Sequence, residues 1–230
     1  MSADLVVCAH GTRDPLGRRT VAEVVTAVAT RLPGVTVHEA YVDVHGPEVA
    51  DVVAALPAAD GPGPAAVVVP LLLAAGYHVR VDLAEAVQGR PDVVVTGALG
   101  PDDRLVDVVL DRLAAATVPD GAAVVLAPAG SSDERSQADS RETAHRLGAR
   151  TGAPVRVGYA AGARPPVACA VTAARVEGAT DVVVASYLLA PGFFQRRLEG
   201  CGADVVTAPL LPDPRVVEVV VDRYLAAAGG

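Results

Sequence analysis

Short apolar runs alternate with amphipathic stretches along the chain. In most of the runs, apolar residues occupy consecutive positions, whereas in the stretches they recur every three or four positions. The first half has strand-like runs at 4–9, 35–42, 65–71 and 92–97, helix-like stretches at 18–32, 47–56 and 101–113, and a further helix expected from about residue 78. Continuous apolar strands joined by helices are typical of a parallel sheet covered on both faces. The pattern therefore predicts an α/β fold.

The second half of the chain repeats the first. Thr96–Leu113 and Thr207–Tyr224 carry the same residue at about half of their positions. "CAHGTRD" from Cys8 pairs with "APAGSSD" from Ala127, and "PLLLAAGYHVR" pairs with "SYLLAPGFFQR" further on. Because the repeating unit is about half of the 230-residue chain, each unit is a whole domain. We therefore predict two similar domains, 1–117 and 118–230, each with a flavodoxin-like parallel sheet flanked by helices, and a cleft between them.

The composition excludes several classes of function. The net charge is -8 and only 3% of the residues are aromatic, so neither phosphate attraction nor base stacking favours nucleic-acid binding. The chain contains no lysine, which excludes a Schiff-base mechanism and a Walker-type phosphate loop. Its basic residues are all arginines, which bind carboxylates or phosphates when several converge.

We expect a cytoplasmic protein without a membrane span. The apolar runs are too short to cross a bilayer, and the N-terminal sequence has neither a basic leader nor a cleavage site. Cys8, Cys169 and Cys201 are widely scattered, which argues against a disulfide framework or a thiolate zinc site. They are interpreted as small buried apolar residues.

Histidines stand where apolar strands end. His10 follows the first strand and His78 the third, while Asp43 and His45 follow the second. Open parallel sheets bind ligands at the carboxyl ends of their strands, where the strand order reverses. With a 2-1-3-4 order, the first and third strands are neighbours about 4.8 Å apart, which suits two imidazoles on one metal ion. Only the first half carries these groups, because His10, Asp43 and His78 align with Ala129, Ala161 and Phe194.

Structural alternatives remain open for these side chains. His10 is alternatively a hydrogen-bonded residue closing its turn, and His78 a residue packed at a helix N-terminus. Asp43 is alternatively the cap of the helix that begins near Pro47, and His45 belongs to a loop. His38 and His145 are expected on the surface. Two roles are open for the remaining candidates: they bind an anion, or they are ordinary surface and capping residues. These candidates are Arg13, Arg18, Arg19, Arg80, Arg196, Arg197, Ser131 and Ser132.

At "AHGTRDP" and "PLLLAAGYHVRVDL" the sequence resembles the sirohydrochlorin chelatase family. These class II chelatases insert cobalt or ferrous iron into a tetrapyrrole on the routes to cobalamin and sirohaem. The family begins with an AHG-S/T-R strand end and carries a P-L-F/L-L-x-x-G-x-H segment later, and both are present here. The resemblance covers the whole chain and is to the long, duplicated form in which one half keeps the histidines.

The resemblance implies a role for each matching residue. It assigns metal binding to His10 and His78, and catalysis to these two with Asp43, which stands where many members have glutamate. It places the macrocycle against Gly11, Arg13, Leu73, Ala74, Ala75, Gly76 and Tyr77. No permanently bound cofactor is implied, since divalent cobalt or ferrous iron is a substrate. The other partner is a carboxylate-rich tetrapyrrole, with no nucleic acid or membrane, and the protein is expected to be a monomer or small homo-oligomer.

The residue chemistry agrees with metal delivery. Two neutral imidazoles suit cobalt and iron better than magnesium or calcium, and two ligands hold an ion without trapping it. Insertion also needs a group that accepts the pyrrole protons, either a histidine or Asp43. Two alternatives stay open: a non-catalytic metal or tetrapyrrole carrier using the same histidines, and a two-lobed solute-binding protein with structural histidines.

Overall fold

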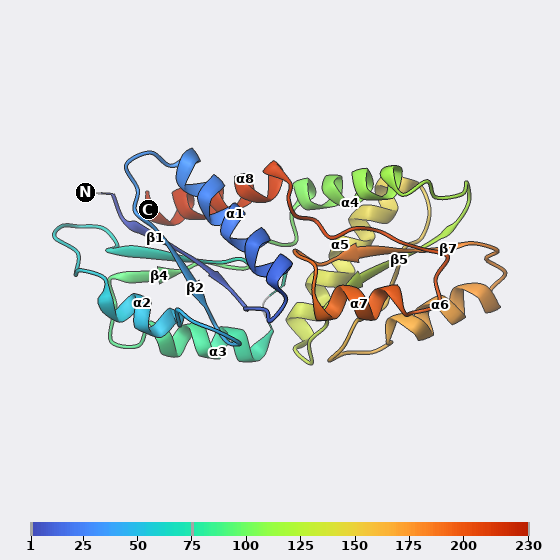
Figure 1. Cartoon of the computed structure of the whole chain (residues 1–230), viewed down its shortest axis with the longest axis horizontal. Coiled ribbons are helices and arrows are strands. Elements are labelled where there is room, and N and C mark those ends of the chain that lie inside the picture. The colour runs from blue at the N-terminus through green and yellow to red at the C-terminus, as the bar shows by residue number, and fades with distance from the viewer. Residues whose placement is uncertain (1, 75, 230) are drawn as a thin grey trace. The chain divides into compact units, whose positions relative to one another are not determined.

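Strands and helices alternate throughout the computed structural model, which describes residues 2–74 and 76–229, with residues 77–79 described by their backbone alone. Figure 1 shows the elements of the first repeat: β1 (Asp4–Ala9), α1 (Pro15–Arg31), β2 (Val37–Tyr41), α2 (Val49–Ala55), β3 (Ala66–Pro70), α3 (Tyr77–Ala86), β4 (Val93–Val95) and α4 (Asp103–Ala115). Those of the second are β5 (Ala123–Pro128), α5 (Glu134–Thr151), β6 (Arg156–Val157), α6 (Val167–Val176), β7 (Val182–Tyr187), α7 (Phe193–Glu199), β8 (Val205–Val206) and α8 (Pro214–Ala228). The predicted α/β alternation is confirmed.

The strands form two parallel sheets with the same topology. Their orders are β2-β1-β3-β4 and β6-β5-β7-β8. The inner strands β3 and β7 are buried at every residue, as expected for largely apolar strands covered by helices on both faces. The order confirms the 2-1-3-4 arrangement, so β1 and β3 are neighbours, with Cys8 opposite Pro70.

The compact units differ from the predicted domains 1–117 and 118–230. The first unit comprises Met1–Leu99 with Pro214–Gly230, and the second comprises Gly100–Asp213. Helix α8 packs on α1 and β3 of the first unit, while α4 packs on α5 and β7 of the second. The exchange is compatible with buried faces that are alike: Leu105, Val106, Val108 and Val109 of α4 align with Val216, Val217, Val219 and Val220 of α8.

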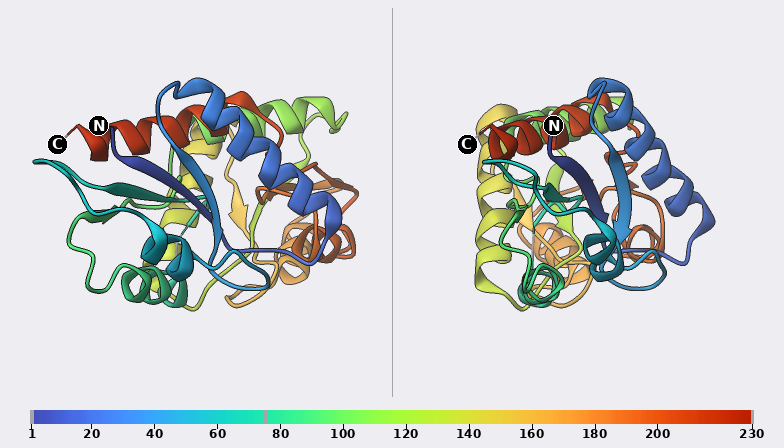
Figure 2. Two further views of the ribbon diagram at one scale, coloured as in Figure 1. Left: turned by 60° about the vertical axis from the view of Figure 1, so that its left-hand side comes forward. Right: turned by 90° about the vertical axis from the view of Figure 1, so that its left-hand side faces the viewer.

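Equivalent arginines fix the exchanged helices. Arg223 of α8 donates to the carbonyl of Leu99 at 3.1 Å, and Arg112 of α4 donates to the carbonyl of Leu210 at 2.9 Å. Each arginine therefore ties its helix to the segment after the last strand of the other repeat. The Tyr224 hydroxyl also donates to the carbonyl of Ala3 at 2.6 Å. This bond brings the N- and C-terminal ends of the first unit together (Figure 2).

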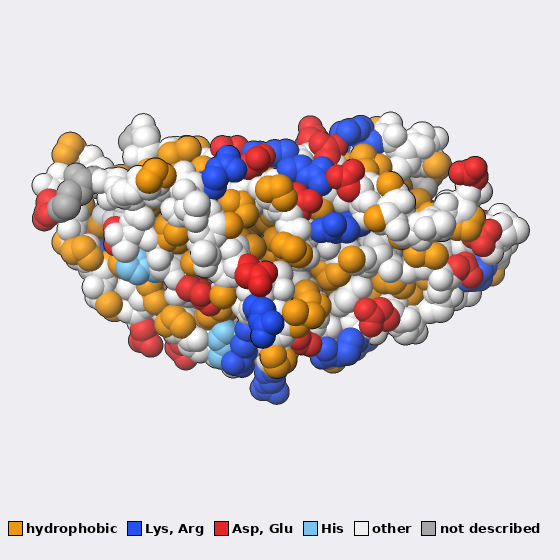
Figure 3. Space-filling model, turned by 45° about the horizontal axis from the view of Figure 1, so that its top comes forward, with side chains coloured by type: hydrophobic (Ala, Val, Ile, Leu, Met, Phe, Trp, Pro, Cys, Tyr) orange, Lys and Arg blue, Asp and Glu red, His pale blue; other side chains and the backbone are white. Residues whose placement is uncertain are grey.

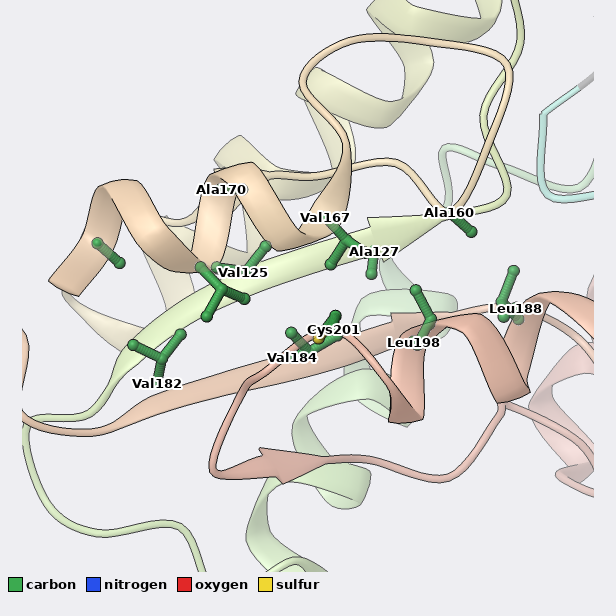
Figure 4. Close-up of a cluster of buried hydrophobic side chains, with 12 residues drawn as sticks. Val125, Ala127, Ala160, Val167, Ala170, Val182, Val184, Leu188, Leu198 and Cys201 are labelled. Carbon is green, nitrogen blue, oxygen red and sulfur yellow. The ribbon is translucent and has the colours of Figure 1, made fainter. Parts of the chain in front are cut away.

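One face of each sheet is sealed by short helices over an apolar cluster. In the second unit, residues of α6 and α7 meet β5 and β7 (Figure 4). Cys201 lies in this cluster and Cys8 in its counterpart in the first unit, as predicted. The prediction is wrong for Cys169, which is exposed because the buried face of α6 runs through Val167, Ala170, Val171 and Ala174. His38 is only partly at the surface, because its side chain is half-buried and its Nε2 lies 2.9 Å from Asp4.

No helix in the described part of the chain is long and apolar enough to cross a bilayer. Acidic and basic side chains are interspersed on the face shown in Figure 3.

A carboxylate placed just before β4 is expected to make stability depend on acid pH. Asp92 accepts hydrogen bonds from Arg90 at 2.9 Å and from the Ala59 amide at 3.2 Å, and the Arg90 bond is the main reason that its pKa falls to about 2. A folded pKa below the ordinary value of 3.8 stabilises the fold above that pH, and the contribution is lost as pH falls toward 2. We expect Asp92→Asn to lower the melting temperature at pH 7, with the difference from wild type shrinking between pH 4 and 2.

Thermal melts across this pH range check the expectation. Asp103→Asn is the control, because its carboxylate is exposed and meets Arg146 on the surface. A difference for Asp92→Asn that is equal at pH 7 and pH 2 would show that the ionised carboxylate is not the source of the stability.

Candidate functional site

The turn after β1 leaves the His10 side chain exposed and is held together by other residues. Asp14 caps α1 by accepting from the amides of Leu16 and Gly17, and the Thr12 hydroxyl accepts from the Asp14 amide at 3.1 Å. These two side chains hold the turn. The His10 imidazole is exposed and makes no hydrogen bond or ion pair with any group that the structure describes. The alternative role of His10 as a turn-closing residue is therefore wrong.

Gly11 allows the end of β2 to approach His10. Its φ is +100°, and a Cβ atom there would lie 2.2 Å from the carbonyl oxygen of Asp43. Only glycine accommodates both the backbone conformation and this close approach. The Asp43 amide donates to the His10 carbonyl at 3.1 Å, which extends the pairing of β1 and β2 past their ends. Asp43 and His10 are thus neighbours across the carboxyl edge of the sheet.

The Asp43 side chain makes its hydrogen bond within its own loop and does not cap the next helix. Its Oδ1 accepts from the Val44 amide at 2.6 Å, and the carboxylate is exposed. The N-cap of α2 is Glu48, with no side-chain capping bond, so the alternative role of Asp43 as the cap of this helix is wrong. His45 lies in the same loop, as predicted, with its ring centroid 3.9 Å from that of Tyr41.

The segment after β3 returns to the same edge. The Leu71 amide donates to the Cys8 carbonyl at 2.8 Å, and the Leu72 carbonyl accepts from Leu99 at 2.8 Å. Leu73, Ala74 and Gly76 are half-buried, and Gly76 is the N-cap of α3. Ala75, a predicted macrocycle contact, lies outside the described residues. Tyr77, a predicted macrocycle contact, and His78, a predicted metal ligand, are described by their backbone alone. The backbone of His78 lies in the first turn of α3.

Other ionisable groups surround this edge. Arg13 is exposed and Arg80 half-buried, while Arg18 donates to the Thr12 carbonyl at 2.9 Å. Burial raises the pKa of the Cys8 thiol to about 12, so this neighbour of the turn stays protonated at neutral pH and offers no thiolate to a metal. The described residues contain no group of three or more His, Cys, Asp or Glu side chains able to hold a metal ion.

The second unit keeps this backbone frame without its chemistry. Gly130 has a φ of +99°, and a Cβ there would lie 1.9 Å from the carbonyl oxygen of Ala161. The Ser131 hydroxyl accepts from the Asp133 amide at 3.1 Å, as Thr12 does for Asp14, and so supports the cap of α5. In place of the histidine segment, α7 carries the buried Gln195, which bonds Ser186 at 2.8 Å and the Thr207 carbonyl at 3.1 Å. The equivalent of the candidate site is therefore apolar or structural here.

Comparison with known proteins decides the family. A model of the CbiX family matches residues 4–116 and, a second time, residues 123–227. The chain belongs to the CbiX family. The resemblance noted from the sequence motifs is thereby confirmed, and the two matches reproduce the internal repeat. No match is found among curated protein sequences.

Solved structures show the same fold over the whole chain. SirB from Bacillus subtilis with Fe3+ has a TM-score of 0.76 and 19% identity, covering 99% of this chain and 96% of that one. The sirohydrochlorin chelatase SirB in complex with cobalt, from Bacillus subtilis subspecies spizizenii, has a TM-score of 0.75 and 19% identity, with coverages of 100% and 96%. CbiX, described as the terminal enzyme for biosynthesis of siroheme in denitrifying bacteria, has a TM-score of 0.70 and 19% identity, with coverages of 97% and 99%. The predicted two-domain chelatase fold is confirmed.

Sequence reasoning missed two residues that shape the site. Thr12 and Asp14 hold the turn of the first unit and leave His10 available. The signal was present, because a Thr-x-Asp-Pro sequence before an amphipathic stretch combines a capping carboxylate with proline at the first helical position.

Proposed function

We propose that this protein inserts a divalent metal ion, cobalt or ferrous iron, into sirohydrochlorin or a closely related tetrapyrrole without ATP. The observation that carries the proposal is the pairing of His10 with Asp43 at the carboxyl edge of the first sheet, joined by the 3.1 Å backbone bond. The pair is replaced by alanines in the second repeat, although the backbone frame is the same. A frame that survives without these side chains does not need them for folding.

The metal ion is a substrate in this reaction, held at first by imidazole. His10 and His78 are the proposed ligands, and pyrrole nitrogens replace them as the ion enters the ring. Two ligands leave coordination positions open for the incoming nitrogens, whereas three or four would retain the ion. The absence of lysine, and hence of a Walker loop, agrees with a reaction that uses no nucleotide.

Metal insertion releases two pyrrole protons, and the same edge of the sheet offers groups to accept them. The exposed His10 imidazole becomes available as a base once the ion has left it. Asp43 is the second candidate base, and its backbone amide is hydrogen-bonded to the His10 carbonyl. Its side chain is one methylene shorter than the glutamate of many relatives, which places its carboxylate nearer the strand end.

The macrocycle is proposed to lie against the segment Leu73–Tyr77 and Gly11. Half-buried small and apolar residues in this segment suit the flat face of a tetrapyrrole. Arg13, in the turn after β1, and Arg80, in α3, are candidates to bind its peripheral carboxylates, since guanidinium groups bind carboxylates bidentately. We place the reaction in the cytoplasm, where the two substrates would meet a monomeric or small oligomeric enzyme.

An anaerobic absorbance assay with sirohydrochlorin and Co²⁺ or Fe²⁺ tests the function. We expect spectral conversion faster than the spontaneous reaction, and loss of the enzyme-dependent rate in His78→Ala. A wild-type protein that binds the macrocycle without exceeding the spontaneous rate would reject the chelatase proposal and favour the carrier. The preferred ion, tested at equal concentrations, assigns the metal.

A further inference from the structure

A groove of about 800 Å³ lies in the second unit, far in sequence from the metal-site candidates. It runs between one face of α5 and the segment 152–165, beside the edge strand β6. Pro154, Val157 and Pro165 contribute to its apolar surface. Arg141, His145 and Arg164 supply its basic groups. The volume falls in the range of small-molecule sites, about 300–1,000 Å³.

The two arginines of this groove have no acidic partner. Arg141 and Arg164 are exposed and make no hydrogen bond or ion pair with any group that the structure describes. On the same helix, Arg146 bonds Glu142 and Asp103, and Arg150 bonds Asp107, whereas the exposed Arg135, outside the groove, has no such side-chain partner within the described structure. In a protein with 27 acidic and 19 basic residues, two unpaired guanidinium groups over one apolar groove form a local anion-attracting surface.

The repeat shows that the fold does not require these basic groups. The frame is the same in both units: Asp14 and Asp133 cap the aligned helices, and the amides of Tyr41 and Tyr159 each donate at 2.9 Å to the carbonyl of an aligned proline. Arg141, His145 and Arg164 take the places of Ala22, Thr26 and Gly46. Val157 takes the place of Glu39, which removes an acid.

The same comparison accounts for the room in the groove. Ala144 stands where α1 has Val25, so the groove wall has lost two methyl groups. Relative to its repeat, the second unit has therefore gained three basic groups and lost one acid at this place, and the wall formed by α5 is smaller at Ala144. Each of these changes favours an anionic ligand, whereas the equivalent frame of the first repeat folds without them.

We infer that this groove binds a small amphipathic molecule with an apolar body and two acidic groups. Each guanidinium would donate two hydrogen bonds to one carboxylate, sulfonate or phosphate, and the apolar body would cover the surface formed by Pro154, Val157 and Pro165. The His145 imidazole lies one helical turn from Arg141 and donates a further hydrogen bond to the acid held there. This binding site is separate from the chelatase proposal and does not depend on it.

Fluorescence titration with bis-ANS, an apolar probe with two sulfonates, tests the site in the full-length protein. The test variant is Arg141→Ala with Arg164→Gly, which installs the residues of the first repeat in an equivalent frame. We expect the dissociation constant to rise by about tenfold or more, because more than one charge-assisted contact is lost. The matched control is Arg135→Ala, an exposed arginine of α5 outside the groove, for which we expect a change below about twofold.

Amide chemical shifts locate the bound probe. In ¹⁵N-labelled protein we expect the largest shifts within residues 141–165, and their loss in the double variant. Equal affinities of wild type and double variant, or shifts confined to other residues, would overturn the inference. If the double variant melts at a lower temperature than wild type, Arg141→Ala alone is titrated, and an unchanged dissociation constant in that variant also overturns it.

Discussion

His10→Ala is expected to lower the enzyme-dependent rate of metal insertion by roughly 10²- to 10⁴-fold, the range for loss of a positioned ligand or proton acceptor. The variant removes the proposed metal ligand that also serves as a base. The rate is measured anaerobically with sirohydrochlorin and each ion, after subtraction of the spontaneous reaction. Because the imidazole is exposed and has no hydrogen bond within the described structure, we expect its removal to leave the melting temperature within about 2 °C of wild type.

The exposed Arg135 provides the control. Arg135→Ala removes an exposed side chain from a helix of the second unit, outside both proposed sites. We expect its insertion rate to stay within about twofold of wild type. A His10→Ala variant that retains the wild-type rate would remove His10 from the mechanism, whatever the result for Arg135→Ala.

The sequence predicts the sheets well because their signal is local. Short apolar runs such as Ala66–Pro70, bounded by turns, favour buried strands, and the 2-1-3-4 order assumed for these strands is the order found. The prediction of the carboxyl edge follows from the same signal. It placed His10 and Asp43 at neighbouring strand ends, where the backbone bond between them is found.

The helix exchange could not be predicted in this way. The buried faces of α4 and α8 carry valine or leucine at equivalent positions, so hydrophobic pattern alone makes each helix fit either sheet. The environments of single residues could not be predicted from the hydrophobic pattern either. The exposure of Cys169 depends on the rotation of α6, and the Asp4 partner of His38 comes from the neighbouring strand β1. Such contacts depend on tertiary packing and not on local sequence.

Gly11→Ala is expected to destabilise the protein by about 2–3 kcal/mol, as both backbone strain and a steric clash are introduced. The φ of +100° disfavours any Cβ atom, and this one would lie 2.2 Å from the Asp43 carbonyl oxygen. Gly34→Ala separates the two causes. Its φ is +90° but nothing lies within 4 Å of the added Cβ, so we expect only the conformational cost of about 1 kcal/mol. Urea unfolding monitored by circular dichroism gives the differences in free energy of unfolding.

Gly130→Ala separates stability from chemistry. Its Cβ would meet the Ala161 carbonyl oxygen at 1.9 Å with a φ of +99°, so we expect a loss of stability similar to that of Gly11→Ala. The consequences for metal insertion should differ. Moving the Asp43 carbonyl away from Gly11 breaks the backbone bond that sets Asp43 beside His10, whereas the matching movement in the second unit displaces only alanines. At a temperature where both variants are folded, we therefore expect the rate to fall at least about tenfold in Gly11→Ala and to stay near wild type in Gly130→Ala. Equal losses of rate in both would mean that the close approach at Gly11 supports the fold without positioning the site.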